Sequence, residues 1–129
     1  MTPNNFNHFH HLSIIFQIFA LKTDGELVTE ERKEIQKLLN EWVDDFETTR
    51  NILIETSQFL SVFDESYPDR ISDLLTYSAT QILDSGVFNS SNLQSVLADL
   101  HDIALADSSQ MSENESMFIA YIRDIWNLQ

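Results

Sequence analysis

The sequence contains no cysteine. A disulfide framework, a thiolate metal site and a cysteine nucleophile are therefore excluded, which fits a reducing compartment. Only two glycines and two prolines occur among the 129 residues. An all-β chain needs a special turn residue at nearly every strand end, so this scarcity favours long helices joined by few turns.

Lysine and arginine are also missing from two long stretches. Residues 1–21 contain no Asp, Glu, Lys or Arg, and residues 71–122 contain acids but no Lys or Arg. The net charge of −14 repels phosphate backbones and anionic lipid headgroups. We therefore expect no nucleic-acid binding and no membrane insertion. Cations or basic proteins remain as partners, and the alternative is that the acidic surface binds nothing.

The longest apolar run covers residues 12–21. It is about half the length of the ~20 residues that a spanning helix needs. The first residues lack the basic segment and the small-residue cleavage site of a signal peptide. We therefore expect a soluble, cytoplasmic chain in which a helix starting near residue 8, apolar on most sides, is buried at the centre.

Helical spacing of apolar residues continues along the chain and predicts an all-α fold, with one domain over residues 1–129 and about six or seven helices. No glycine or proline interrupts residues 30–63, so one long helix is an alternative there. We favour a break near residues 48–50, because a single helix would be ~50 Å long and would outgrow the domain. Pro68, Gly86 and Asn89 mark further helix ends.

Two acidic turns in the sequence resemble each other. Without a gap, Asp24 aligns with Asp107, Thr29 with Ser112, and Glu30 with Glu113. Each turn follows an apolar helix and precedes an amphipathic one, and Ser112 and Glu115 have the spacing of a capping box. The chain is therefore predicted to contain two pseudo-repeated helix-turn-helix units, about 8–46 and 90–127, around middle helices at about 50–86.

The first acidic turn is not an ordinary EF-hand. With Gly25 at the sixth loop position, Glu31 falls on the twelfth, but the first and third positions are Ala20 and Lys22. Oxygen ligands are required at both of these positions. An EF-hand is therefore excluded.

The paired turns, each with an apolar helix before it and a Ser or Thr cap and a Glu after it, resemble the tellurite-resistance TerB-like family. The resemblance implies a helical bundle of two repeats, a clustered acidic site for divalent metal ions, and a role in stress-response or protein-assembly complexes. Thr23 and Ser108 stand where the family pattern has Ala and Gly. By position, the resemblance nominates as metal ligands Asp24, Glu26, Glu31, Asp107, Glu113 and Glu115.

The chemistry of these acids leaves two alternatives open. Carboxylate oxygens suit hard cations, so Ca²⁺, Mg²⁺ or Mn²⁺ would be favoured over Zn²⁺. Acids in the first turn of a helix also stabilise its dipole without binding any ion. His8 and His11 lie on one helical face and could hold Zn²⁺, but we expect the histidines to lie in an exposed, partly disordered start.

No catalytic motif is present: there is no Gly-rich phosphate loop, no G-x-S-x-G and no H-E-x-x-H. The first hypothesis is a non-enzymatic acidic module of TerB-like type that binds a divalent cation and docks on another protein. The alternative is a metal-free interaction domain whose acidic surface binds basic partners. A hydrolase that uses the same carboxylates with a metal is the third.

Overall fold

The computed structural model describes residues 1–24, 29–106 and 109–128, without the side chains of residues 23 and 24. These ranges contain six α-helices and no strand, which confirms the predicted all-α bundle. The helices are α1 (His8–Asp24), α2 (Thr29–Val43), α3 (Phe46–Ser66), α4 (Ile71–Asp84), α5 (Ser90–Ala104) and α6 (Glu113–Ile125), and a short 3-10 helix, η1 (Pro68–Arg70), precedes α4.

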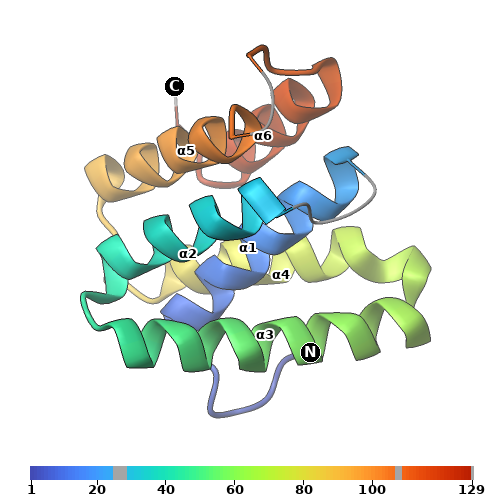
Figure 1. Cartoon of the computed structure of the whole chain (residues 1–129), viewed down its shortest axis with the longest axis vertical. Coiled ribbons are helices and arrows are strands. Elements are labelled where there is room, and N and C mark those ends of the chain that lie inside the picture. The colour runs from blue at the N-terminus through green and yellow to red at the C-terminus, as the bar shows by residue number, and fades with distance from the viewer. Residues whose placement is uncertain (25–28, 107–108, 129) are drawn as a thin grey trace.

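Helix α1 lies at the centre of the bundle. It contacts α2, α3, α4, α5 and α6, and Figure 1 shows it in the middle with the other helices around it. Residues 10–20 are buried without a gap. The buried part of this helix contains no Asp, Glu, Lys or Arg and is mostly apolar, so its burial is favourable and the predicted central position is confirmed.

The break between α2 and α3 lies earlier than predicted. The sequence placed it near residues 48–50, whereas α2 ends at Val43 and α3 begins at Phe46. Asp44 adopts a φ of 58°, and the Asp45 carboxylate accepts a hydrogen bond of 2.9 Å from the Thr48 backbone N–H. An Asp that caps the new helix fixes its start, and Asp tolerates the left-handed conformation better than most residues. The prediction of two helices is right, and its position is wrong.

Other helix ends follow their local signals. Pro68 occupies the first position of η1, and Gly86, with a φ of +72°, follows the end of α4. Asn89 caps α5, where its side-chain oxygen accepts from the Asn92 N–H at 2.8 Å. These ends confirm the predicted boundaries, because each depends on residues close together in the sequence.

Phe6 and Asn7 connect the start of the chain to the bundle. The Asn7 side-chain oxygen accepts from the Phe9 and His10 backbone N–H groups and so caps α1. The Phe6 ring stacks on His10 at a centroid distance of 4.4 Å and meets the edge of Phe59 at 5.6 Å. Residues 1 and 3–5 are exposed, and the expected partial disorder of the start stays a prediction.

Across the described ranges, no helix is both long enough and apolar enough to cross a membrane.

Candidate functional site

Three of the six nominated metal ligands have side chains that the structure describes. Glu31, in the first turn of α2, is fully buried. In the first turn of α6, Glu113 is exposed, whereas Glu115 is 4% exposed. The side chain of Asp24, at the end of α1, and all of Glu26 and Asp107 lie outside the described residues. The structure therefore does not test whether the two acidic turns meet.

Glu115 has a local structural role. Its Oε1 accepts from the Ser112 backbone N–H at 2.7 Å, and the Ser112 hydroxyl accepts from the Glu115 N–H at 3.2 Å. This reciprocal pair is the predicted capping box, and it satisfies two of the free N–H groups at the start of α6. Among the described residues, no three His, Asp or Glu side chains gather closely enough to hold a metal ion.

The histidines of α1 face the interior. His10 and His11 are 6% and 5% exposed, and His10 Nε2 lies 3.3 Å from Glu55 Oε1. Burial, helped by the charges of His10 and His8, lowers the pKa of His11 to about 4, so that its ring is neutral at pH 7. The expectation of exposed histidines is wrong, because their helix is the buried one.

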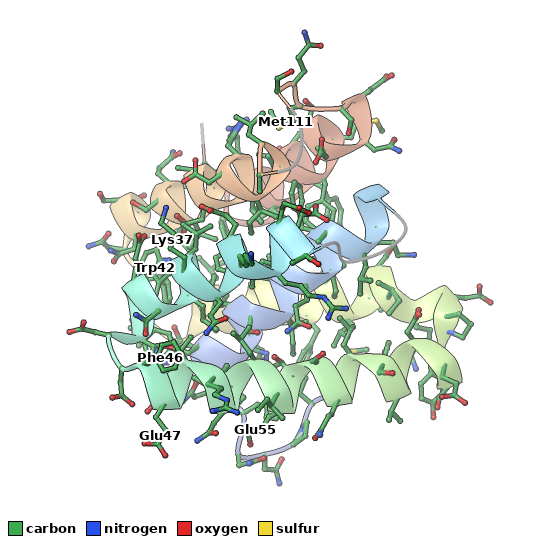
Figure 2. All side chains as sticks on the ribbon, in the orientation of Figure 1. Lys37, Trp42, Phe46, Glu47, Glu55 and Met111 are labelled. Atoms are coloured by element: carbon green, nitrogen blue, oxygen red, sulfur yellow. The ribbon has the colours of Figure 1, made fainter. Side chains whose placement is uncertain are left out.

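A cleft of about 400 Å³ with two acidic residues in its lining lies between α2 and α5. It is lined by Glu41 and Trp42 from α2 and by Ser95, Ala98 and Asp99 from α5. The Trp42 indole N–H donates to Asp99 Oδ2 at 2.7 Å. Figure 2 labels Lys37 and Trp42 on the side of α2 that faces α5.

The electrostatics of this cleft centre on Asp99. Burial raises the pKa of Asp99 from 3.8 to about 6. The Trp42 hydrogen bond opposes this rise, and the charges of Glu41, Asp102 and Glu34 add to it. Glu34 is in turn 3.8 Å from the Lys37 ammonium through its Oε2. Asp99 is therefore a half-buried carboxylate among like charges, and a cation beside it would stabilise its ionised form.

Trp42 gives the cleft an aromatic wall. It is half-buried, and its ring packs on Phe88 at a centroid distance of 5.2 Å. The carboxylates beside it create a negative field, and an aromatic face attracts cations. The arrangement therefore suits an organic cation with an apolar stem, such as an arginine or lysine side chain.

A second, more apolar groove of about 500 Å³ lies where α1, α4 and α6 meet. Its walls include Ile18, Leu75 and Phe118, with the exposed Met117 and Tyr121 at the surface. The Tyr121 hydroxyl hydrogen-bonds to Thr76 on α4 and so links the two helices at the rim. Lys22 also lines this groove and brings a positive charge to it.

The sequence analysis identified neither Trp42 nor Asp99 as a functional residue. The two residues are 57 positions apart, and they meet only because α2 packs on α5. In the sequence, Asp99 is visible only as a polar residue at the edge of the apolar stripe of α5, and this position does not show which residue it contacts.

Comparisons with known proteins give no relative. No protein-family model matches the chain. No curated protein and no solved structure matches it either.

Proposed function

We propose that this chain is a non-enzymatic helical module that binds a basic segment of another protein in the cleft between α2 and α5. The observation that carries the proposal is the cleft itself, which is lined by Trp42 and by the half-buried Asp99. The negative charges of Glu34, Glu41 and Asp102 act on Asp99. The net charge of −14 supports it, because long-range attraction speeds the encounter with basic partners. As the sequence predicts, we place the module in the cytoplasm.

An arginine side chain would use both kinds of surface. Its methylene stem would lie on the Trp42 indole, and its guanidinium would meet Asp99 and Glu41. Asp99 Oδ2 accepts from Trp42, and its other oxygen remains able to accept from a ligand. Aromatic side chains at a partly desolvated centre contribute most of the energy in many interfaces, so Trp42 is the expected anchor.

The test is binding of a fluorescein-labelled peptide of alternating arginine and leucine, measured by fluorescence anisotropy. The same peptide with glutamine in place of arginine serves as the comparison ligand. We expect only the arginine peptide to bind, and Asp99→Asn and Trp42→Phe to weaken it, Asp99→Asn by about tenfold, because a partly buried charge pair is lost.

Glu47→Gln is the matched control, since it removes the same charge from α3, outside the cleft; Figure 2 labels this residue. A loss of affinity equal to that of Asp99→Asn would mean that the peptide follows net charge, and it would refute the cleft as a specific site. High salt screens surface charge, so it should reduce the affinity of the arginine peptide for the wild type and for every variant.

A second candidate is the divalent-cation module that the TerB-like resemblance implies, with a stress-response or protein-assembly role. What supports it is the resemblance of the two acidic turns, each followed by a helix whose first turn carries two acids: Glu30 and Glu31 in α2, Glu113 and Glu115 in α6. The Glu115 carboxylate also closes a capping box.

Thermal unfolding with and without Ca²⁺, Mg²⁺, Mn²⁺ and Zn²⁺ tests the second candidate. A ligand that binds only the folded state raises its stability, so one ion should raise Tm by several degrees in the wild type. Asp24→Asn and Asp107→Asn should both abolish the shift if the two turns share the ion. Equal small shifts with every ion in all three proteins would reflect charge screening and would refute the metal site.

A further inference from the structure

Three polar side chains lie inside the apolar core between α1 and α3. They are Ser13, Gln17 and Thr56, whose exposed fractions are 0%, 4% and 0%. Burying such groups is costly unless each one is hydrogen-bonded. The Ser13 and Thr56 hydroxyl oxygens are 2.8 Å apart, and the Gln17 Nε2 lies 3.0 Å from Ser13 Oγ and 2.9 Å from Thr56 Oγ1.

The direction of each bond in this network is determined. Thr56 Oγ1 donates its proton to the Ile52 carbonyl at 2.7 Å, so it accepts from Ser13. The Ser13 proton is thereby used as well. Gln17 then meets two oxygens with no proton left to give, and only its NH₂ group can bond to both. A flipped amide would set its oxygen against two acceptors, so the network fixes Gln17 Oε1 on the opposite side.

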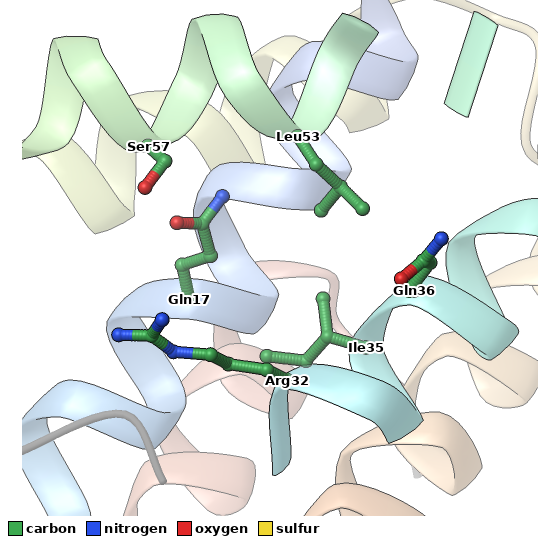
Figure 3. A pocket seen from close by; sticks show the side chains of 6 residues that line it. All are labelled: Gln17, Arg32, Ile35, Gln36, Leu53 and Ser57. Atoms are coloured by element: carbon green, nitrogen blue, oxygen red, sulfur yellow. The ribbon is translucent and has the colours of Figure 1, made fainter. Parts of the chain in front are cut away.

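That oxygen lies at a cavity of about 180 Å³ between α1, α2 and α3. The cavity is lined by Gln17, Arg32, Ile35, Gln36, Leu53 and Ser57. Figure 3 shows the Gln17 oxygen turned toward the region between the Ser57 hydroxyl and the Arg32 guanidinium, with Ile35 and Leu53 facing each other beside it. The cavity thus combines a fixed acceptor, a cation, a hydroxyl and an apolar wall.

We propose that this cavity binds a small α-hydroxy or α-amino carboxylic acid. Arg32 already takes part in another interaction, but its planar guanidinium has five N–H donors, so the carboxylate would bind the donors that face the cavity. The adjacent hydroxyl or ammonium would donate to Gln17 Oε1, and a short alkyl group would lie against Ile35 and Leu53. The cavity is open to solvent on one side, since the lining Arg32 is exposed, and its volume suits a ligand of about six to eight non-hydrogen atoms.

The site is independent of the acidic cleft. The cleft lies between α2 and α5, whereas Gln17 and Ser57 belong to α1 and α3. A variant at Asp99 should therefore leave the small-acid site unchanged, and binding of a basic peptide gives no information about it.

The experiment is a titration of the full chain with L-lactate and, separately, L-alanine, followed by ¹H–¹⁵N NMR. Saturable shifts of the Gln17 side-chain NH₂ signals and of the Ile35 and Leu53 backbone signals are expected with at least one of the two. Propionate, which keeps the carboxylate and the alkyl group, should bind roughly tenfold more weakly, because it leaves Gln17 Oε1 without a donor. This comparison tests the oxygen without altering the core.

Arg32→Gln should weaken binding by about tenfold or more, since a charged hydrogen bond is lost. Arg50→Gln is the matched control, because it removes an exposed arginine from α3 that does not line the cavity. The proposal is overturned if neither acid gives a saturable shift, if propionate binds as well as L-lactate, or if Arg50→Gln has the effect of Arg32→Gln.

Discussion

Two tryptophans near the ends of the two predicted repeat units have different surroundings. The Trp126 indole N–H donates to the Ala79 carbonyl at 2.9 Å, and the residue is 3% exposed. The Trp42 indole N–H donates to the Asp99 carboxylate at 2.7 Å, and the residue is half-buried beside an open cleft. The first arrangement serves packing alone. The second keeps a charge and an aromatic face within reach of a ligand, which is why we propose the α2–α5 cleft as a binding site.

Truncating the two tryptophans should give the largest difference between the regions. Trp126→Ala removes a buried aromatic side chain and the hydrogen bond that its indole donates to the Ala79 carbonyl, so unfolding free energy should fall by about 3–5 kcal/mol. Trp42→Ala should cost clearly less, because part of its ring already contacts water. Urea unfolding of both variants measures the difference. Equal losses would make Trp42 a structural residue and would remove the contrast between the two sites.

The buried network around Gln17 shows that the interior also contains polar structure. Thr56→Val keeps the shape of the side chain but removes the oxygen that Ser13 and Gln17 both use. Two buried donors then lack a partner, and the loss should be about 1–3 kcal/mol in unfolding free energy. Thr80→Val is the control, since its hydroxyl donates to the Thr76 carbonyl one helical turn earlier and takes part in no side-chain network among the described residues. Similar losses in both variants would show that the network adds nothing beyond one hydroxyl.

Local signals predicted much of the fold. The uncharged N-terminal stretch indicated the central helix, and Asn89 and Ser112 indicated helix starts that form as expected. Each of these depends on contacts within a few residues. The α2–α3 break was predicted at the wrong residues, although the cap that determines it, Asp45, is also a local signal. No glycine or proline marks the break, so an aspartate cap is the only local sign of it in the sequence.

The candidate sites were not predictable in this way. Trp42 and Asp99 are 57 residues apart, and Ser13 and Thr56 are 43 apart. Which polar residue meets which depends on how helices pack, and helical periodicity gives the buried face without the neighbour. The acidic turns were the strongest sequence signal for function, and the side chain of Asp24, with Glu26 and Asp107, lies outside the described residues, so that prediction stands as it was made.

The pH dependence of Tm gives the last test of the cleft, and we expect it to show the smallest effect. The pKa of Asp99 is about 6 in the folded chain against an ordinary value of 3.8. Between these values the folded chain holds a proton that the unfolded chain has released, so Asp99 favours folding at low pH, and this contribution is lost as the pH rises through about 6. Asp99→Asn should therefore leave Tm nearly unchanged near pH 4 and raise it relative to the wild type at pH 7.

Buried His11 acts in the opposite direction over the same range, which is why the difference between variant and wild type has to be measured. Its folded pKa of about 4 lies below the ordinary 6.5, so the unfolded chain gains the proton first, and stability falls as the pH drops from about 6.5 toward 4. Subtracting the two Tm profiles cancels His11 and isolates Asp99. A bound arginine peptide should flatten the subtracted profile, because a cation beside Asp99 returns its pKa toward the ordinary value. If the difference is flat without peptide, Asp99 behaves as an ordinary surface acid, and the cleft loses the feature that separates it from the packed environment of Trp126.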